Sequence, residues 1–358
     1  MDMNYIISHS SALEYWRRQR RLGAGSGAEV GARLGAGSGA GLGAGLGAGS
    51  GADLGAGSGS GAAARVNIPP SAPPNKKFVA DAGNLGLTMP LNILVADAPA
   101  RKVNKLVVSH VCRVSLPKGC FFDAGNSLLA SSPELCFLQM AGDMPLLKLI
   151  ELGFELCGTY SMPAGADDEA VGATMQLDAP LTTVAKLQSL ALKMEGTHGR
   201  KNALQALRYV VENSASPMET LLAMLLFLPY NLGGYGLAKP LLNKRVDVGK
   251  TAKKAIDKSY YRCDLYWPVA KLGIEYDSDT YHTGAARIAE DAKRRNALAY
   301  LGIQSLTITK QQLYNRSEFD KVVHQISKQL GKRLRCNNPN FAKKQLALRA
   351  LLPVLASQ

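Results

Sequence analysis

The chain has 358 residues, which is enough for two domains that each have a hydrophobic core. Its 42 Lys and Arg outnumber its 28 Asp and Glu, and the net charge of +14 favours a polyanionic partner, either nucleic acid or an anionic membrane surface. The longest apolar run, residues 221–228, is too short to span a bilayer, so we expect no membrane insertion. Six cysteines without a C-x-x-C pair are typical of reduced thiols in a cytoplasmic protein.

The first part of the chain is predicted to be a short helix followed by a linker. Residues 1–21 have a serine-containing entry and then an apolar stripe with Leu13 and Trp16, which favours an N-terminal helix. Residues 22–75 consist largely of Gly, Ala and Ser and end in a group of prolines. This composition cannot bury enough apolar surface to offset the entropy lost on ordering, so we expect a flexible linker.

Residues 76–200 are predicted to form a smaller α+β domain. Strand patterns occur at residues 91–95 and 105–114, bounded by Gly- and Pro-containing turns. At residues 131–140 a serine, a proline and a glutamate precede an apolar face, which is a helix start signal. Further helices are expected at residues 144–152 and 180–195.

Residues 201–335 are predicted to form a second domain, of α/β class. A buried helix is expected to begin after Ser216, because this residue can cap it, Pro217 suits its first position and Glu219 lies in its first turn. The other expected elements are a helix at 201–213, a hairpin around residue 270, a helix at 286–301, a strand at 303–308 and a helix at 311–334. Residues 336–358 are predicted to be a basic C-terminal tail.

The hairpin carries acidic side chains on neighbouring strands. Two antiparallel strands joined by a loop at residues 268–271 would pair Trp267 with Leu272, Leu265 with Ile274, and Asp264 with Glu275. Alternation then places Asp264, Glu275 and Asp277 on one face, with Cys263 and the apolar residues on the other. Opposed carboxylates repel each other unless a cation lies between them, so the pattern predicts a metal site. The alternative is a hairpin whose exposed charges only maintain solubility.

The motifs of residues 214–334 resemble the PD-(D/E)xK nuclease superfamily, and more closely its very-short-patch-repair-like branch of small endonuclease domains. The matching motifs are Glu219-Thr220, R-x-D-x-x-W-P at 262–268, K-L-x-I-E-Y-D at 271–277, Tyr281-His282, and D-x-x-R-x-x-x-L-x-x-x-G at 291–302. The resemblance implies a restriction-endonuclease-like α/β fold, in which helices flank a central mixed sheet. It also implies hydrolysis of phosphodiester bonds in DNA, in repair or in phage defence.

The resemblance also assigns roles to single residues. Asp264 and Glu275 would bind Mg²⁺ or Mn²⁺, ions that prefer hard oxygen ligands, with Glu219 in support. His282 would act as a general base or acid, and Asp277 belongs to the same catalytic group. DNA would be contacted by basic residues of the helix at 286–301 and of the C-terminal region. These residues are Lys293, Arg294, Arg295, Lys332, Arg333 and Arg335.

Two departures leave other functions open. Asp277 stands where the superfamily has a lysine, and Ser278 stands where a glycine is usual, so a non-cutting, DNA-binding regulator with a degenerate nuclease fold is the alternative. Residues 7–16, 131–140 and 155–160 are similar to regulator-like regions that precede such nuclease domains, and to antitoxins of abortive-infection systems. A protein-interaction module is a third possibility, for which the basic charge would be incidental.

Overall fold

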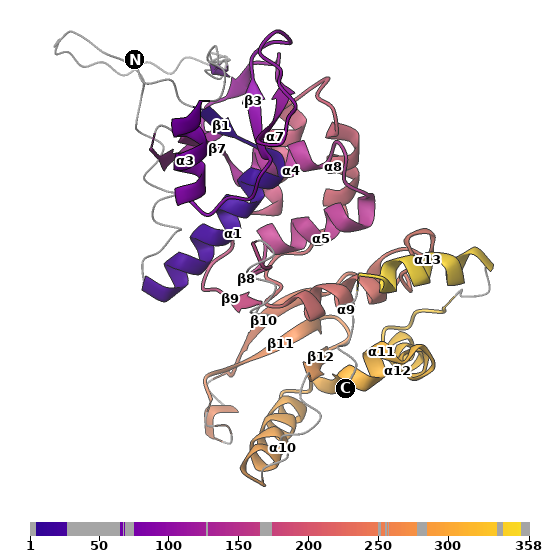
Figure 1. Cartoon of the computed structure of the whole chain (residues 1–358). Coiled ribbons are helices and arrows are strands. Elements are labelled where there is room, and N and C mark those ends of the chain that lie inside the picture. The colour runs from indigo at the N-terminus through magenta and orange to yellow at the C-terminus, as the bar shows by residue number, and fades with distance from the viewer. Residues whose placement is uncertain are drawn as a thin grey trace, which may run out of the picture. The chain divides into compact units, whose positions relative to one another are not determined.

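The structure, a computed structural model, describes residues 5–26, 65–66, 68, 75–126, 128–164, 174–249, 252–254, 256, 258–277, 285–334 and 339–351. The chain divides into two compact units (Figure 1). Unit 1 comprises Met1–Gly142, Ala164–Val171 and Lys186–Arg200, and unit 2 comprises Asp143–Pro163, Gly172–Ala185 and Lys201–Gln358. Both units combine mixed sheets with flanking helices, so the predicted mixed α/β class is confirmed at that level. Residues 143–163 and 172–185, predicted within the first domain, belong to unit 2.

Unit 1 is built on a five-stranded sheet with the order β4-β3-β1-β7-β6. Its middle strand, β1 (Tyr5–Ile7), was not predicted, because three residues are too few to show a strand pattern, although all three are buried. The helix predicted over residues 1–21 therefore begins only after this strand, as α1 (His9–Ser26). The other elements of the unit are β2 (Arg65–Val66), α3 (Lys76–Asn84), β3 (Leu91–Val95), β4 (Val107–Val111), β5 (Leu116–Pro117), β6 (Phe121–Gly125), β7 (Leu128–Ser131), α4 (Pro133–Met140) and α7 (Val184–Lys193).

Helices α1 and α4 of unit 1 are fixed by side chains that were identified in the sequence. The indole of Trp16 on α1 is buried and donates to the backbone oxygen of Ser131, at a distance of 2.8 Å. The helix start predicted at residues 131–140 is confirmed, since the Ser132 hydroxyl accepts from the Leu135 amide and caps α4. Most of the predicted linker at 22–75 lies outside the described residues.

Unit 2 contains a four-stranded sheet in the order β10-β11-β12-β13, with a long buried helix, α9 (Pro217–Phe227), before it in the chain. The start of α9 is as predicted, because the Ser216 hydroxyl accepts from the Glu219 amide at 3.1 Å. The other elements are α5 (Leu146–Leu156), β8 (Tyr160–Ser161), β9 (Met175–Gln176), α8 (Arg200–Leu207), η1 (Tyr230–Leu232), β10 (Leu241–Asp247), η2 (Ala252–Lys254), β11 (Tyr260–Trp267), β12 (Leu272–Asp277), α10 (Ala285–Tyr300), β13 (Gln304–Thr309), α11 (Lys310–Tyr314), α12 (Arg316–Gln329) and α13 (Pro339–Arg349).

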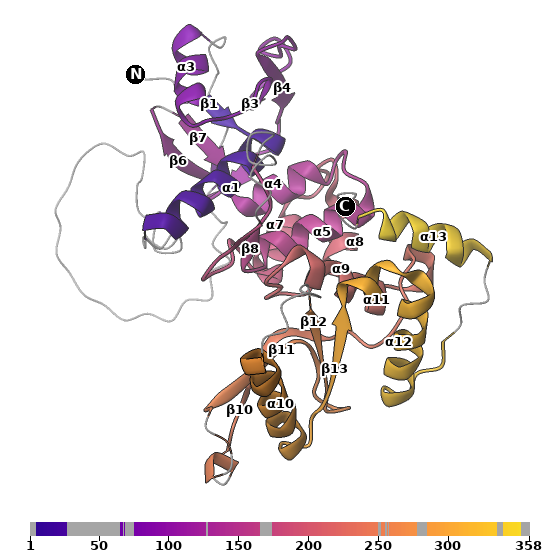
Figure 2. The same cartoon turned by 60° about the horizontal axis from the view of Figure 1, so that its bottom comes forward.

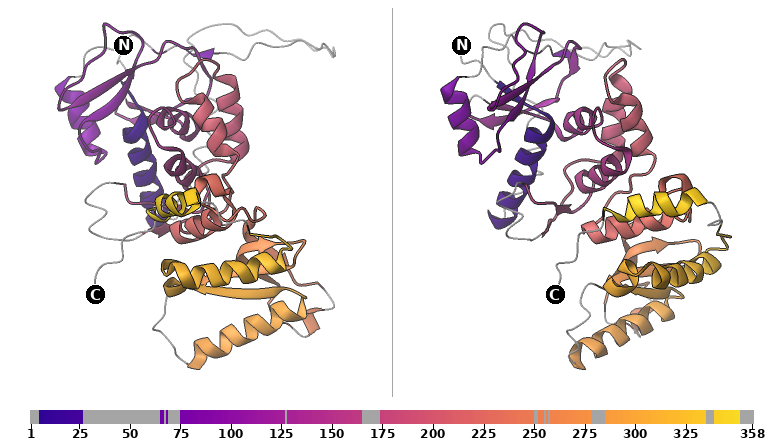
Figure 3. Two further views of the ribbon diagram at one scale, coloured as in Figure 1. Left: turned by 90° about the vertical axis from the view of Figure 1, so that its right-hand side faces the viewer. Right: turned by 45° about the vertical axis from the view of Figure 1, so that its right-hand side comes forward.

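The predicted hairpin is present with the predicted loop, but its predicted pair Asp264–Glu275 is not formed, because the ladder ends one residue earlier. β11 and β12 are antiparallel, with Trp267 opposite Leu272 and Leu265 opposite Ile274. β12 then runs parallel to β13, and α10 makes the crossover between them. In Figure 3 this sheet lies between α10 on one side and α12 on the other.

Three features of unit 2 differ from the sequence prediction. β10 was missed, because its seven residues include Asn, Lys, Arg and Asp and lack a clean apolar alternation. The single helix predicted at 311–334 is divided at Asn315, which leaves the helical conformation and caps α12 through its side chain. Residues 336–358 were predicted to be a tail, but α13 lies within them, and its Phe341 and Leu348 are buried.

No helix in the described part of the chain is both long and apolar enough to cross a bilayer.

Gly273 on β12 permits a close contact that holds β12 and β11 together. A Cβ atom at this position would lie 2.8 Å from the Cys263 sulfur, so we expect Gly273→Ala to lower the free energy of unfolding by about 1–3 kcal/mol. Chemical denaturation would measure this loss. In a Cys263→Ala background the loss caused by Gly273→Ala should be smaller, because the sulfur that the new Cβ would meet is absent. Gly249→Ala is the control, because no atom lies within 4 Å of its added Cβ. Equal effects at positions 273 and 249 would contradict the contact.

Candidate metal and nucleic-acid site

The candidate site lies where β11 and β12 part. The two strands pair as far as Leu265 and Ile274, and beyond this point β12 pairs only with β13. We call this point the fork and define it by Asp264 and Glu275, together with the backbone of Arg262 and Tyr276. The fork leaves a backbone N–H and a backbone carbonyl without partners in the β11–β12 ladder, and buried groups of this kind need a hydrogen bond from elsewhere.

Side chains supply both hydrogen bonds at the fork. The Tyr276 amide donates to Oδ2 of Asp264 at 2.8 Å. The Arg262 carbonyl accepts from the guanidinium of Arg294, which reaches it from α10. Asp264 and Arg294 therefore hold the fork open at a defined width, and each has a structural role in addition to any chemical one.

Asp264 also lies at an irregular position between β11 and β10. The register of these strands skips the pair Asn243 and Asp264, and Asn243 has a φ of 47°, a left-handed conformation that asparagine tolerates better than most residues. The Asn243 side chain donates to Oε2 of Glu219 at 2.6 Å. Asn243 was missed by sequence analysis, since nothing in the motif marks it, and it connects the start of α9 to the sheet.

The prediction that Cys263 lies on the face away from Glu275 is wrong. Cys263 packs in a cluster with Ala297 and Leu298 of α10, the helix whose Arg294 binds Glu275. The reason is that strict alternation along β11 fails at Asp264, where the pairing with β10 is interrupted.

Glu219 is buried at the first turn of α9, with a hydrogen bond for each of its oxygens. Oε2 accepts from the Ala215 amide at 2.9 Å and from Asn243, and Oε1 accepts from the Ser216 hydroxyl at 3.0 Å. Burial raises the pKa of Glu219, and these three donors oppose the rise. With Ser216 it forms a reciprocal cap, which accounts for its position without a ligand.

Asp264 is the most perturbed acid at the fork. Its pKa is raised from 3.8 to about 7, mainly by burial, and also by the nearby carboxylates of Glu219 and Glu275. The hydrogen bond from Tyr276 and the charge of Arg294 act in the opposite direction. Asp264 therefore lies within electrostatic range of each of the other two predicted acids.

Arg294 supplies the positive charge at the fork. Its Nε donates to Oε1 of Glu275 at 2.7 Å, and a second nitrogen binds the same oxygen. Both side chains are partly exposed, at 29% for Arg294 and 23% for Glu275. Arg294 was predicted to contact DNA, whereas here it neutralises one of the predicted metal ligands.

The donor atoms at the fork have the chemistry of a Mg²⁺ or Mn²⁺ site. Asp264 and Glu275 offer carboxylate oxygens, and in the described residues Tyr276 is the sole hydrogen-bond donor to Asp264. Arg294 occupies Oε1 of Glu275, so an ion held by both acids would compete with Arg294 for that oxygen. Across the described residues, no group of three or more His, Cys, Asp or Glu is arranged to hold a metal.

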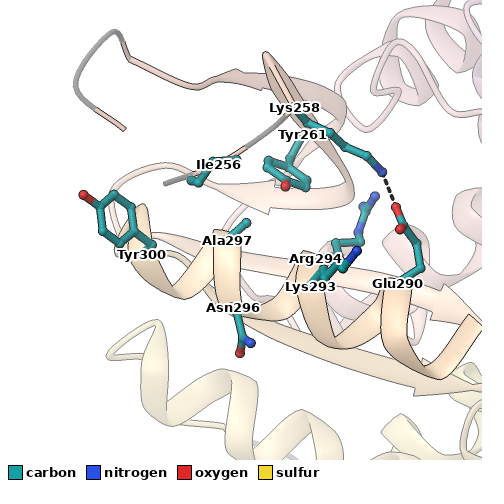
Figure 4. Close-up of a pocket in the computed structure, with 9 residues that line it drawn as sticks. All are labelled: Ile256, Lys258, Tyr261, Glu290, Lys293, Arg294, Asn296, Ala297 and Tyr300. Atoms are coloured by element: carbon teal, nitrogen blue, oxygen red, sulfur yellow. Dashed lines mark hydrogen bonds and ion pairs between the residues drawn. The ribbon is translucent and has the colours of Figure 1, made fainter. Parts of the chain in front are cut away.

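A pocket of about 420 Å³ lies beside the fork, between α10 and the residues that lead into β11 (Figure 4). Lys258 and Glu290 form an ion pair of 2.6 Å across it. Tyr261, Lys293 and Arg294 are among its other lining residues. The pocket is thus lined by more basic than acidic side chains, and Arg294 belongs both to its wall and to the fork.

The remaining predicted residues are not gathered at the fork. Asp277 ends β12, opposite Thr309 of β13. Arg295 is exposed on α10, and Lys332 and Arg333 are exposed beyond the end of α12. His282 and Arg335 lie outside the described residues.

Comparisons with protein-family models, with curated proteins and with solved structures find no match for the chain.

The raised pKa of Asp264 predicts that unit 2 loses stability as the pH rises from about 4 to about 7. In this range the folded state retains a proton that the unfolded state has released, so unfolding is favoured by each increase in pH. The slope approaches about 1.4 kcal/mol per pH unit, and Asp264→Asn, which cannot ionise, should remove it. Asp264→Asn should therefore exceed the wild type in stability at pH 8 and lose that advantage at pH 4.

Trp267 on β11 is buried and can report this unfolding. Denaturation at several pH values would be followed by the fluorescence of Trp267. Both proteins, Asp264→Asn and its parent, would carry Trp16→Phe, which removes the fluorescence of the second of the two tryptophans. Parallel pH profiles for Asp264→Asn and its parent would contradict the assignment.

Proposed function

We propose that unit 2 is a restriction-endonuclease-like domain that hydrolyses phosphodiester bonds in DNA with Mg²⁺ or Mn²⁺. The observation that carries the proposal is the position of Asp264, which lies within electrostatic range of both Glu219 and Glu275 and whose pKa is raised by burial and by these two acids. Burying like charges together is unfavourable for folding alone, and it is common at functional sites. The order of α9, β11, β12, α10 and β13 supports the same proposal, because the resemblance of the sequence motifs implies that order.

Each residue at the fork has a distinct part in the proposed reaction. Asp264 and Glu275 would hold the metal ion, which supplies polarisation of the phosphate and a lowered pKa of the attacking water. The guanidinium of Arg294 would move from Glu275 to the phosphate and stabilise the negative charge that develops there. Glu219 and Asn243 would position β10 relative to α9. Asp277 and His282 are candidates for proton transfer, and the missing lysine leaves this role with them.

Plasmid nicking tests the proposal directly. We expect the wild type to nick supercoiled DNA with Mg²⁺ or Mn²⁺ but not with EDTA. Asp264→Ala should lower the rate by more than about 100-fold, because the ion then lacks a ligand. Glu318→Ala is the matched control, since it removes an exposed carboxylate from α12 of the same unit. Equal rates for Asp264→Ala and Glu318→Ala would remove the site assignment.

The ion pair between Arg294 and Glu275 favours a second candidate function. If Arg294 stays on Glu275, it provides the cation that the acids need, and unit 2 would bind DNA without cutting it. The sequence departures at Asp277 and Ser278 point in the same direction. In this case the chain would be a DNA-binding regulator, which fits the regulator-like and antitoxin-like resemblance of its N-terminal portion.

Metal binding separates the two candidates independently of cutting. For a nuclease, Mn²⁺ should raise the melting temperature of the wild type by several degrees at saturating concentration and leave Asp264→Ala unchanged. Arg294→Gln should bind Mn²⁺ more tightly than the wild type, because Glu275 is no longer occupied, and yet cut more slowly. Differential scanning calorimetry with and without Mn²⁺ would measure the shifts. If Mn²⁺ stabilises neither the wild type nor Arg294→Gln, the DNA-binding regulator becomes the better proposal.

A further inference from the structure

β10 and the first half of β11 extend beyond the rest of the sheet. They pair from Leu241 and Tyr266 out to Asp247 and Tyr260, whereas β12 pairs with β11 only over residues 265–267. We call residues 241–262 the arm. Figure 2 shows its strands beside α10. The arm belongs to unit 2 and leads directly into Asp264.

One side of the arm is fixed to α10. Val248, Ile256 and Tyr261 are buried in one cluster with Ala297 and Leu298. This packing sets the position of the arm before any ligand arrives, as a surface that positions a substrate requires. The opposite face of the same strands is exposed. It carries Arg245, Asp247, Tyr260 and Arg262.

The exposed face of the arm places two arginines directly opposite each other. Arg245 and Arg262 are register partners, and like charges at such positions destabilise a sheet. Arg245 is paired with Asp247 at 2.6 Å and stacks on Tyr260 at 4.1 Å from the ring centroid. The guanidinium of Arg262 has no hydrogen bond or ion pair to any described residue, although its carbonyl binds Arg294. The chain from 241 to 262 contains seven Lys and Arg and two Asp.

The arginine pair lies close to the fork along the strands. Two residues further along β11 from Arg262 is Asp264, and two residues back along β10 from Arg245 is Asn243. Two residues of a β-strand span about 7 Å. A phosphate bound by the arginine pair would therefore lie about 7 Å from Asp264 along β11.

We propose that Arg245 and Arg262 together bind one backbone phosphate of a DNA strand, next to the phosphate that the fork receives. One phosphate between the two guanidinium groups would offset the repulsion between their positive charges and accept hydrogen bonds from both. The arm then sets the register of the strand relative to Asp264. This inference rests on the proposed function for its DNA partner, and it adds the surface that holds the substrate.

Binding of a fluorescein-labelled 20-bp DNA duplex in EDTA tests the proposal without cutting. Fluorescence anisotropy at 50–200 mM NaCl gives the affinity and its salt dependence. We expect Arg245→Ala/Arg262→Ala to weaken binding by roughly tenfold at 50 mM, and the slope of log K against log[salt] to fall in magnitude by about 0.9, the value for one phosphate. Lys201→Ala/Arg208→Ala, which removes the same charge from the region of α8, is the control and should leave the slope unchanged.

Arg262→Glu distinguishes binding from a structural role. Glutamate opposite Arg245 removes the cross-strand repulsion, so the melting temperature should rise or stay equal while DNA affinity falls at least as far as in the double variant. An affinity and slope equal to the control would overturn the proposal. So would a slope change near two, which indicates two separate phosphates, or the absence of DNA binding by the wild type.

Failure of the nuclease proposal would be seen separately. Arm-dependent DNA binding without Mg²⁺-dependent nicking would leave the arginine pair as a DNA contact of a non-cutting protein. Metal-dependent nicking, together with DNA binding that the arm variants do not change, would support the nuclease proposal and contradict the proposed role of the arginine pair.

Discussion

The candidate site depends on the parting of β11 and β12. A hydrogen-bonded ladder that stops inside a domain leaves backbone N–H and C=O groups that need other hydrogen-bond partners. Here an aspartate and an arginine side chain provide them. Asp264 accepts a hydrogen bond from the amide of Tyr276, and Arg294 donates one to the carbonyl of Arg262. The residues that hold the strands apart are thus the same residues that carry the charge of the site.

The electrostatic balance at the fork follows from this arrangement. Asp264 is half-buried near two other acids, which favours its neutral form, while Glu275 is partly exposed and paired with Arg294. A divalent ion would favour the charged form of Asp264 and compete with Arg294 for Glu275. The position of Arg294 is therefore the point at which a cutting and a non-cutting protein would differ.

Unit 2 combines an acidic fork with a basic surface on one continuous pair of strands. Going outward along β10 and β11, the fork is followed by two opposed arginines and then by Tyr260 and Asp247. This order suits a polyanion that lies along the arm, with one phosphate at the acids. Unit 1 has its own sheet and its own buried core.

Local sequence patterns determined the elements with strong local signals. Ser216, Pro217 and Glu219 fixed the start of α9, and the spacing around residues 268–271 fixed the hairpin and its register, because capping and alternation act within a few residues. The tertiary structure alone decided the rest. It supplied β10, whose polar sequence forms a strand only against β11, and it moved Cys263 to the α10 side by interrupting the alternation at Asp264. It also brought Arg294 onto Glu275, a contact between residues 19 positions apart that no local pattern encodes.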